Sequence, residues 1–382
     1  MKILMLSNNY LPHVSGVSVS ITRTMRNLEK LSHDIELVVP AYPNYVEPNP
    51  KIHRIQSLPL SEPLIPLPLP GKKALRQIVE KFKPDLMHTH HPFLLGKTAL
   101  KIAKEKNIPI VMTYHSMYEE YIHYIPLLPE KILKKYVIRN VKNFANQLNA
   151  IVAPSESIFK ILHERNFKPP VQVIPTGINP EYFVTPPSAR LTTRDNWGIN
   201  EKDIIIISFA RLAKEKNFNL LMEAFSQVLK KTSFAVKLVL GGDGPAKSSL
   251  QNLAKKLGIE KNTIFTGDIP HEDVPKFLAG GDIFAYPSLS ETQGLVTLEA
   301  LASGLPAVVV DAPGNRDVVE NNVCGLVSGT DLYSFSSALI KLVSKKELRM
   351  KLASNARKRA DEFSETRMAK KMESLYESLI QK

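Results

Sequence analysis

The sequence holds a single cysteine, Cys324, among its 382 residues. One thiol excludes a disulfide framework and any metal site built from several cysteines, and it suits a reducing cytosol. No segment reaches the roughly 20 apolar residues that a helix needs to span a bilayer. The apolar residues 2–6 are followed by polar Ser7-Asn8-Asn9 and by no small-residue cleavage signature, which predicts a buried strand and not a signal peptide. We therefore expect a cytoplasmic protein, either soluble or peripheral to a membrane.

Metal-binding motifs are also scarce. No Asp-x-Asp pair stands at the end of a predicted strand. His88, His90 and His91 are close together, but neighbouring residues of a strand point to opposite faces, and Asp85 is the one carboxylate near them. We therefore expect no metal and no cofactor, and we interpret these histidines as residues that line a substrate cleft.

Positive charge is unevenly spread along the chain. The formal net charge is +13, and residues 1–180 contribute 23 Lys and Arg against 13 Asp and Glu. A one-sided positive field attracts anionic lipid surfaces or nucleic acid, the alternative being ordinary basicity. The basic segments lack interleaved aromatic residues, and no nucleic-acid recognition motif is present. The charge therefore favours a membrane surface over nucleic acid.

Short apolar segments alternate with amphipathic ones through most of the chain. Strands are predicted at 2–6, 35–39, 85–88, 108–113, 150–153, 204–209, 236–241, 263–266, 283–286 and 306–310, and helices at 17–31, 72–82, 97–106, 156–165, 217–230, 247–257 and 291–302. Such alternation predicts parallel sheets covered by helices on both faces. The pattern restarts after Thr185-Pro186-Pro187-Ser188. We predict two doubly wound α/β domains, 1–185 and 186–364, facing each other across a cleft, with a last helix, 365–382, that crosses back to the first domain.

Two candidate binding groups follow predicted strands. Gly16 precedes helix 17–31, whose first amides can face a phosphate, although an ordinary turn is the alternative. Arg211 and Lys216 follow the apolar strand 204–209, where two cations can neutralise a diphosphate or simply be solvated.

A third group stands at a junction between a loop and a helix. Glu291 lies in the loop and can accept hydrogen bonds from sugar hydroxyls, and Glu299 lies about two turns into the helix, within reach of a ribose. An exposed helix position is the alternative for Glu299, but its apolar neighbours favour a carboxylate with a partner. The amides that open this helix can bind a phosphate, and they belong to Gly294, Leu295 and Val296.

Taken in order, these motifs resemble those of the retaining glycosyltransferases of family 4, which have the GT-B fold. The resemblance covers nearly the whole chain and rests on Gly16-Val17, Thr113-Tyr114-His115, Ile174-Pro175-Thr176-Gly177-Ile178, Phe209-Ala210-Arg211-Leu212, Lys216-Asn217, Gly241-Gly242-Asp243-Gly244-Pro245 and the paired glutamates. It implies that Arg211 and Lys216 hold the donor diphosphate, Glu291 the transferred sugar and Glu299 the ribose. It also places the backbone near Ile269 at the base and His115 beside the anomeric carbon.

Further details are similar to the diacylglycerol glucosyltransferases, which make monoglucosyldiacylglycerol from UDP-glucose. They are Glu291-Thr292-Gln293-Gly294-Leu295-Val296, where many members read Glu-Gly-Phe-Gly-Leu-Pro, His88-Thr89-His90-His91-Pro92-Phe93, the run from Thr113 to Tyr121, and His123-Tyr124. This resemblance implies transfer of glucose to the 3-hydroxyl of 1,2-diacylglycerol at the inner face of the cell membrane. The acceptor side then falls to His88, His91, Tyr114 and Tyr118. Sugar-lipid and sulfolipid synthases are close relatives, and another donor or a soluble acceptor stays open, as does the oligomeric state.

The segment 130–148 predicts a basic amphipathic helix. Its apolar stripe is Leu133, Val137, Val141, Phe144 and Leu148, and its cations are Lys131, Lys134, Lys135, Arg139 and Lys142. We expect the apolar stripe to face the protein and the basic face to contact an anionic membrane. The Leu- and Pro-rich segment 58–70 predicts an extended loop that either reaches the lipid headgroups or packs on its own domain.

A mechanism follows from these assignments. The donor binds the second domain and the acceptor the first, and domain closure brings the acceptor hydroxyl to the anomeric carbon. Cationic side chains and helix amides stabilise the leaving UDP in place of a divalent ion. No carboxylate is placed as a covalent nucleophile, which favours same-face attack assisted by the leaving phosphate. A catalytically silent sensor of UDP-sugars is the rival that the intact set of Arg211, Lys216, Glu291 and Glu299 disfavours.

Overall fold

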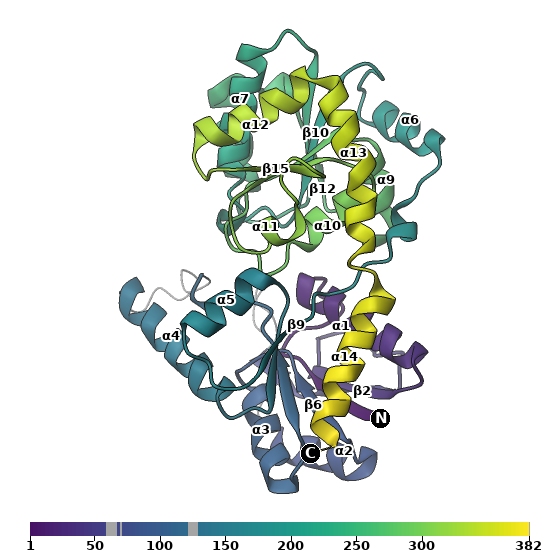
Figure 1. Cartoon of the computed structure of the whole chain (residues 1–382), viewed down its shortest axis with the longest axis vertical. Coiled ribbons are helices and arrows are strands. Elements are labelled where there is room, and N and C mark those ends of the chain that lie inside the picture. The colour runs from purple at the N-terminus through teal and green to yellow at the C-terminus, as the bar shows by residue number, and fades with distance from the viewer. Residues whose placement is uncertain (59–66, 69–70, 121–128, 382) are drawn as a thin grey trace. The chain divides into compact units, whose positions relative to one another are not determined.

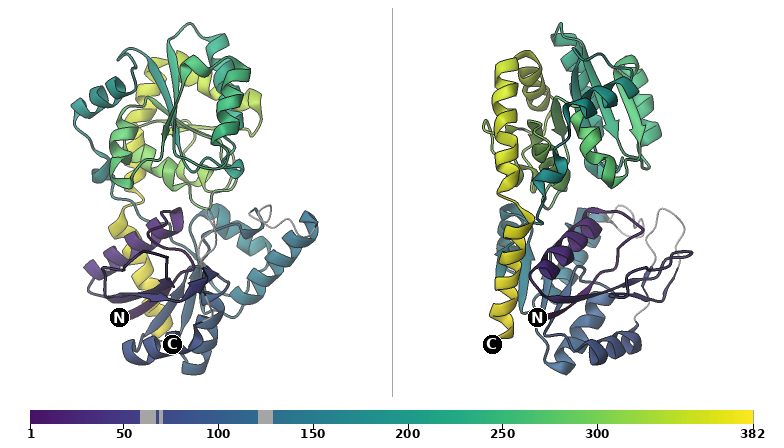
Figure 2. Two further views of the ribbon diagram at one scale, coloured as in Figure 1. Left: turned by 180° about the vertical axis from the view of Figure 1, so that it is seen from behind. Right: turned by 90° about the vertical axis from the view of Figure 1, so that its right-hand side faces the viewer.

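The computed structural model describes residues 1–58, 67–68, 71–120 and 129–381 (Figures 1 and 2). It divides into two compact units: unit 1 comprises Met1–Gly177 and Glu365–Lys382, and unit 2 comprises Ile178–Ser364. The change of unit comes ahead of the Pro-rich stretch at which the sequence pattern placed it. Ile178 and Phe183, which precede that stretch, are buried in the core of unit 2.

Unit 1 is built on a seven-stranded parallel sheet with the order β3-β2-β1-β6-β7-β8-β9. Its strands are β1 (Lys2–Leu6), β2 (Asp34–Pro40), β3 (Ile52–Ile55), β6 (Leu86–Thr89), β7 (Ile110–Thr113), β8 (Ala150–Ala153) and β9 (Val171–Val173). Strands β2 and β3 lie on one side of β1, and strands β6 to β9 lie on the other. The short strands β4 (Ser57–Leu58) and β5 (Leu67–Pro68) form a separate antiparallel pair.

Helices cover both faces of this sheet. They are α1 (Gly16–Lys30), α2 (Lys72–Phe82), α3 (Leu95–Lys106), α4 (Glu130–Ala145), α5 (Glu156–Glu164) and α14 (Glu365–Ile380). Because side chains of a strand alternate between faces, Leu4 and Leu6 enter one core, and Ile3 and Met5 enter the other. Helices α1 and α14 pack together over the second core, which includes Tyr376. The last helix therefore belongs to unit 1 (Figure 1).

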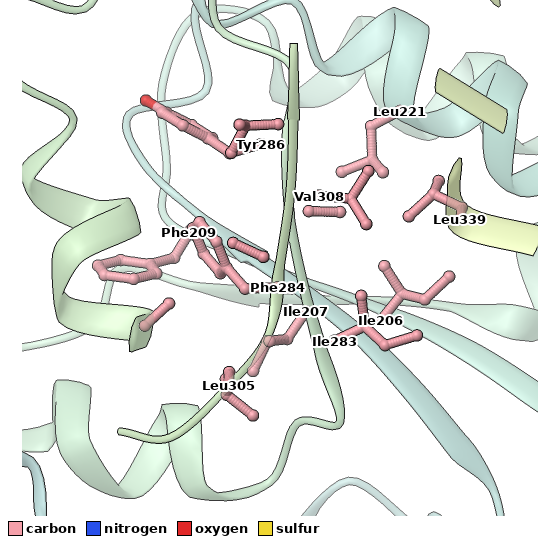
Figure 3. Close-up of a cluster of buried hydrophobic side chains, with 14 of the residues drawn as sticks. Ile206, Ile207, Phe209, Leu221, Ile283, Phe284, Tyr286, Leu305, Val308 and Leu339 are labelled. Atoms are coloured by element: carbon pink, nitrogen blue, oxygen red, sulfur yellow. The ribbon is translucent and has the colours of Figure 1, made fainter. Parts of the chain in front are cut away.

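Unit 2 repeats the same plan with a six-stranded parallel sheet, β12-β11-β10-β13-β14-β15. Its strands are β10 (Ile204–Phe209), β11 (Val236–Gly241), β12 (Thr263–Gly267), β13 (Ile283–Tyr286), β14 (Ala307–Val310) and β15 (Gly325–Ser328). Its helices are α6 (Pro187–Asn196), α7 (Phe218–Lys231), α8 (Lys247–Leu257), α9 (Val274–Ala279), α10 (Leu295–Ala302), α11 (Asn315–Val318), α12 (Leu332–Ser344) and α13 (Lys346–Asp361). In Figure 3, Leu221 of α7 and Leu339 of α12 lie on the same side of the strands as Val308.

The prediction of two doubly wound α/β domains is confirmed. All ten predicted strands are present, and the edge strands β3, β9 and β15 and the short strands β4 and β5 were missed. Most of the Leu- and Pro-rich segment 58–70 lies outside the described residues. Within the part of the chain that the structure describes, none of the helices is both long enough and apolar enough to cross a bilayer.

Candidate active site

Each sheet has one place where the strand order reverses, and the predicted site residues gather at those two places. In unit 1 the reversal lies between β1 and β6, and in unit 2 between β10 and β13. Loops that leave two such strands run to opposite sides, which opens a binding edge at the carboxyl ends of the strands. The unit 1 edge and its flanking loops carry Gly16, His88, His91, Tyr114, His115 and Tyr118. The unit 2 edge and its flanking loops carry Arg211, Lys216, Ile269, Glu291, Gly294, Leu295, Val296 and Glu299.

An ion pair occupies the unit 2 edge. Lys216 ends a 3₁₀ turn (Lys214–Lys216) that follows β10, and Glu291 lies in the loop after β13. Lys216 Nζ is 2.6 Å from Glu291 Oε1, and the two side chains are 17% and 15% exposed. The fold thus joins two residues that the sequence analysis had assigned separately to the diphosphate and to the sugar.

Two hydroxyl groups complete the environment of Glu291. Ser288 Oγ and Tyr286 Oη each donate to Glu291 Oε1 at 2.8 Å. Burial by itself raises the pKa of Glu291, but Lys216 and the two hydroxyl donors outweigh it and leave that pKa below its usual value. Burial raises the pKa of Tyr286, so its hydroxyl stays protonated and keeps donating. Glu291 is therefore a fixed, ionised hydrogen-bond acceptor at neutral pH.

A buried amide supports the loop that carries Glu291. Asn315, at the start of α11, is fully buried; its Nδ2 donates to the Ser288 carbonyl at 2.8 Å, and Thr297 Oγ1 donates to its Oδ1 at 3.3 Å. Asn315 therefore ties the Glu291 loop to α10. Asn315 was not predicted from the sequence, although the Gly314-Asn315 pair in the loop after the buried strand β14 was a usable signal.

Two glycines allow the loops at this part of the edge to pack closely against each other. Gly294, the residue before α10, has φ of 79°, and Gly314 has φ of 76°. A Cβ on Gly314 would lie 2.8 Å from the Cβ of Glu291, so a larger residue would displace the glutamate. The first turn of α10 then presents the amides of Leu295 and Val296, and Glu299 follows on the same helix with 5% of its surface exposed.

The loops after β10 and β11 lie backbone against backbone. The amide of Leu212 donates to the carbonyl of Asp243 at 2.8 Å. Gly242 has φ of 109°, and a Cβ there would lie 2.1 Å from the carbonyl oxygen of Ala210. Only glycine permits that approach. The packed loop fixes the backbone on both sides of Arg211, whose side chain is exposed at the edge.

The loop after β12 joins the same edge. Gly242 donates from its amide to the carbonyl of Gly267 at 2.7 Å. Ile269 packs against Gly241, where an added Cβ would lie 2.3 Å from its Cδ1. The residue assigned to the nucleobase therefore lies beside the loop that fixes Arg211.

The unit 1 edge is built mainly from neutral groups. His88 is fully buried, and its Nδ1 and Nε2 are within 2.6 Å of Tyr376 Oη and 2.8 Å of Thr113 Oγ1. Burial lowers the pKa of His88 to about 3. Tyr114 is also buried, with 1% of its surface exposed. Neither His88 nor Tyr114 has surface with which to touch an acceptor, so both support the edge from within instead of lining it.

The other predicted residues of unit 1 do reach the surface in part. His91 Nδ1 accepts a hydrogen bond from the amide of Asn8 at 3.2 Å, and burial lowers the pKa of His91 to about 4. Its neutral ring therefore carries its proton on Nε2. Tyr118 is partly exposed and meets Phe93 edge to face. Gly16 begins α1 and is exposed, preceded by a capping Ser15.

His115 follows β7 and is linked to a third histidine. His90 Nδ1 and His115 Nε2 are 2.8 Å apart, and their rings are stacked with centroids 5.1 Å apart. His115 is partly exposed, whereas His90 is only 2% exposed. Among the residues described, no three His, Cys, Asp or Glu side chains are grouped so as to hold a metal ion.

Helix α4 buries one face and exposes another. Leu133, Val141 and Phe144 are buried, as the predicted apolar stripe requires. On the outer face Ile132 is 60% and Tyr136 63% exposed. The cations beside them are Lys131, Lys135 and Arg139, all exposed. Lys142 is half-buried, and Lys134 pairs with Glu130 and Glu120 at 3.3 and 3.5 Å.

Comparison with known proteins follows the division into two units. The model for Glycosyltransferase Family 4 matches residues 14–182, and that for Glycosyl transferases group 1 matches residues 189–359. An alpha-monoglucosyldiacylglycerol synthase of Streptococcus pneumoniae is 32% identical over 85% of this chain and 74% of its own length. One from Acholeplasma laidlawii is 30% identical over 100% of this chain and 98% of its own length.

The fold also matches solved structures. Anabaena Alr3699/HepE, crystallised in complex with UDP-glucose, superposes with a TM-score of 0.80 over 99% of this chain and 100% of its own, at 20% identity. At that identity the similarity concerns the fold, and it places both units in the GT-B architecture.

Proposed function

Because the chain belongs to glycosyltransferase family 4, we propose that it transfers glucose from UDP-glucose to the 3-hydroxyl of 1,2-diacylglycerol. The product is monoglucosyldiacylglycerol, formed with retention of configuration at the anomeric carbon. The main structural support is the Lys216–Glu291 pair at the unit 2 edge, which offers a cation to a diphosphate and an ionised carboxylate to a sugar. Support for the lipid acceptor comes from the two synthases, which are similar along most of the chain.

The donor is proposed to bind the unit 2 edge. Arg211 and Lys216 neutralise the diphosphate, together with the amides at the start of α10. Glu291 accepts hydrogen bonds from the glucose hydroxyls, Glu299 binds the ribose, and the backbone at Ile269 meets the uracil. Glu291 compensates the charge of Lys216 across 2.6 Å. The half-buried cation is therefore ready for a second anion without a large rearrangement.

Transfer breaks the bond between the anomeric carbon and the diphosphate oxygen and forms one to the acceptor hydroxyl. Negative charge grows on the leaving UDP, and the cations and helix amides that already face it stabilise that charge. The acceptor hydroxyl attacks on the face from which UDP leaves and passes its proton to the departing phosphate oxygen. His115 is proposed to act beside the anomeric carbon, and the scheme uses no divalent ion.

The acceptor is proposed to come from the inner face of the cell membrane. Lys131, Lys135 and Arg139 of α4 are exposed next to two exposed apolar side chains, Ile132 and Tyr136. Cations attract anionic headgroups at about 1 kcal/mol each, and adjoining apolar groups enter the interface. Lys142 lies on the same helix, whereas the two acidic partners of Lys134 reduce its contribution. Of the four residues predicted on the acceptor side, His91 and Tyr118 have surface available to an acceptor.

The test is a transfer assay with radiolabelled UDP-glucose and diacylglycerol in mixed micelles that contain an anionic lipid. A labelled glycolipid is expected, and it should disappear with Glu291→Ala. Parallel reactions with GDP-mannose and with a soluble sugar acceptor resolve the specificity. Binding of UDP without a labelled lipid would overturn the acceptor assignment, and failure to bind UDP at all would overturn the donor assignment too.

A further inference from the structure

Four aromatic side chains form a continuous path inside unit 1, which we name the histidine array: Tyr376, His88, His90 and His115. It begins on α14, where Tyr376 Oη meets His88 Nδ1 at 2.6 Å. The rings of His88 and His90 stack with centroids 4.3 Å apart and planes 30° apart. His90 Nδ1 then meets His115 Nε2 at 2.8 Å. The path thus runs from the last helix to the partly exposed ring of His115.

We propose that His90 is a positioning residue that fixes both the orientation and the tautomer of His115. The proposal rests on the proposed function only in placing His115 beside the anomeric carbon. His90 itself is too deeply buried to touch either substrate, since only 2% of its surface is exposed. It acts through the 2.8 Å bond to His115 and the stacking of the two rings.

Counting protons assigns the tautomers. A hydrogen bond between two imidazole nitrogens needs one N–H and one lone pair. His90 Nε2 is buried and has no hydrogen-bond partner within the described residues. A buried N–H without an acceptor is less tolerable than an unused lone pair, so the His90 proton belongs on Nδ1. His90 therefore donates to His115, whose Nε2 is the acceptor and whose own proton lies on Nδ1.

The surroundings keep this arrangement uncharged. His90 contacts His88 of β6 and His115 after β7, His91 follows it in the chain, and Tyr376 of α14 contacts His88. A proton added to His90 would lie close to the imidazoles of His88, His91 and His115, which offer it no negative charge. Burial, with the three neighbouring histidines, accordingly holds the pKa of His90 well below its usual value. His115 thus presents a neutral ring with a fixed Nδ1–H, and its Nε2 is not available as a proton acceptor for the reaction.

The far end of the array is anchored on both sides. Both nitrogens of His88 are engaged, one by Tyr376 and the other by Thr113. Thr113 lies two residues before His115 at the end of β7. His90 therefore stacks on a ring that is held between α14 and the segment that carries His115, which limits rotation of the whole array.

Two substitutions distinguish a positioning role of His90 from a packing role. His90→Asn keeps a hydrogen-bonding group close to the position of Nδ1, whereas His90→Leu keeps much of the volume and removes the bond. We expect His90→Leu to lower kcat by about 10- to 100-fold, the loss of one buried hydrogen bond, and His90→Asn to recover most of that loss. The Kd for UDP, measured by calorimetry, should change less than twofold in both variants. His163→Leu, at an exposed histidine of α5, is the matched control.

The second readout is nitrogen NMR of histidine-labelled protein, which does not depend on the acceptor being correct. In the unsubstituted protein the His115 signal should show a neutral ring protonated at Nδ1 between pH 6 and 8. In His90→Leu the tautomer should shift toward Nε2–H, or the ring should begin to titrate in that range. An unchanged His115 signal in a folded His90→Leu would overturn the proposal, as would equal losses of kcat in the Leu and Asn variants. A chain that glucosylates no lipid while its tautomers behave as described would overturn the proposed function alone.

Discussion

Apart from the additional strand β9 of unit 1, the two units have the same strand order, yet one carboxyl edge is charged and the other is neutral. The unit 2 edge holds an ionised pair, Lys216 with Glu291, and the exposed Arg211. The unit 1 edge holds His88, His90, His91 and His115, all with a pKa lowered by burial. The same topology therefore produces two edges, and the residues at the strand ends determine which kind of ligand each edge suits. A charged edge suits a diphosphate, and a neutral edge suits a hydroxyl group.

The largest expected effect is at the charged edge. Lys216→Ala removes the cation assigned to the diphosphate and leaves Glu291 without its charged partner, and losing such a contact costs about 3–5 kcal/mol of interaction with the donor. We expect kcat/KM for UDP-glucose to fall by roughly two to three and a half powers of ten. Lys214→Ala, at an exposed lysine two residues away, is the control and should leave kcat/KM nearly unchanged. Comparable turnover in the two variants would remove Lys216 from the donor site.

The two edges should also lose their contributions to folding stability in different pH ranges. A buried histidine stays neutral in the folded unit, so its contribution is complete above pH 6.5 and is lost as pH falls toward its folded pKa, about 3 for His88 and 4 for His91. Within that pH range, each such histidine lowers the free energy of unfolding by about 1.4 kcal/mol for each pH unit of acidification. Glu291, whose pKa is lowered, keeps its contribution until pH falls below about 4.5, the ordinary value of a glutamate.

Hydrogen exchange separates these two windows, because peptides from β6 and from β13 report the two edges independently. Between pH 6.5 and 5 we expect protection to fall in β6 and to hold in β13. Equal losses in both strands over that range would mean that the histidines do not govern the stability of unit 1.

A smaller effect is expected where an uncharged group supports the charged edge. Asn315→Ala removes the hydrogen bond to Ser288 and leaves a buried carbonyl without its donor. An unsatisfied buried acceptor costs about 1–3 kcal/mol. The loop should loosen, raising KM for UDP-glucose by roughly 5- to 100-fold while kcat changes less. Asn200→Ala, at an exposed asparagine, gives the baseline. If KM stayed constant and only the melting temperature fell, Asn315 would be a packing residue without influence on the donor.

An effect of similar size, on membrane binding instead of donor binding, concerns the outer surface of unit 1. Replacing Lys131 and Lys135 by Gln removes two exposed cations, each of which contributes about 1 kcal/mol at an anionic membrane. Binding to vesicles of anionic and zwitterionic lipid should weaken by roughly one to two powers of ten and should lose much of its salt dependence. The same substitutions at Lys230 and Lys231 of α7 provide the control. Equal binding by the two double variants would exclude α4 as the contact.

The strands and the charged residues were predictable because both depend on local patterns. Buried parallel strands such as Ile204–Phe209 are continuous apolar runs, and the sequence shows them directly. The edge strand Val171–Val173 is short and only half-buried, so it carries no such run and was missed. Lys216 and Glu291 were found because ionisable residues after an apolar strand are conspicuous.

The support around those residues was not predictable, since it depends on which distant segments meet. Tyr376 lies on the last helix, and nothing near it in the sequence points to His88. The same holds for Asn315, which reaches back to Ser288 across a strand and a helix. The histidine motif suggested an acceptor surface, but only the fold shows that His88 and His90 are interior and that His91 is partly exposed.

The most direct test is a calorimetric titration of UDP into the unsubstituted protein, Lys216→Ala and His90→Leu. If the donor is held by the charged edge alone, UDP binding should weaken by at least about 100-fold in Lys216→Ala and by less than twofold in His90→Leu. Unaltered binding by Lys216→Ala, or a comparable loss in His90→Leu, would contradict the division between a charged donor edge and a neutral one.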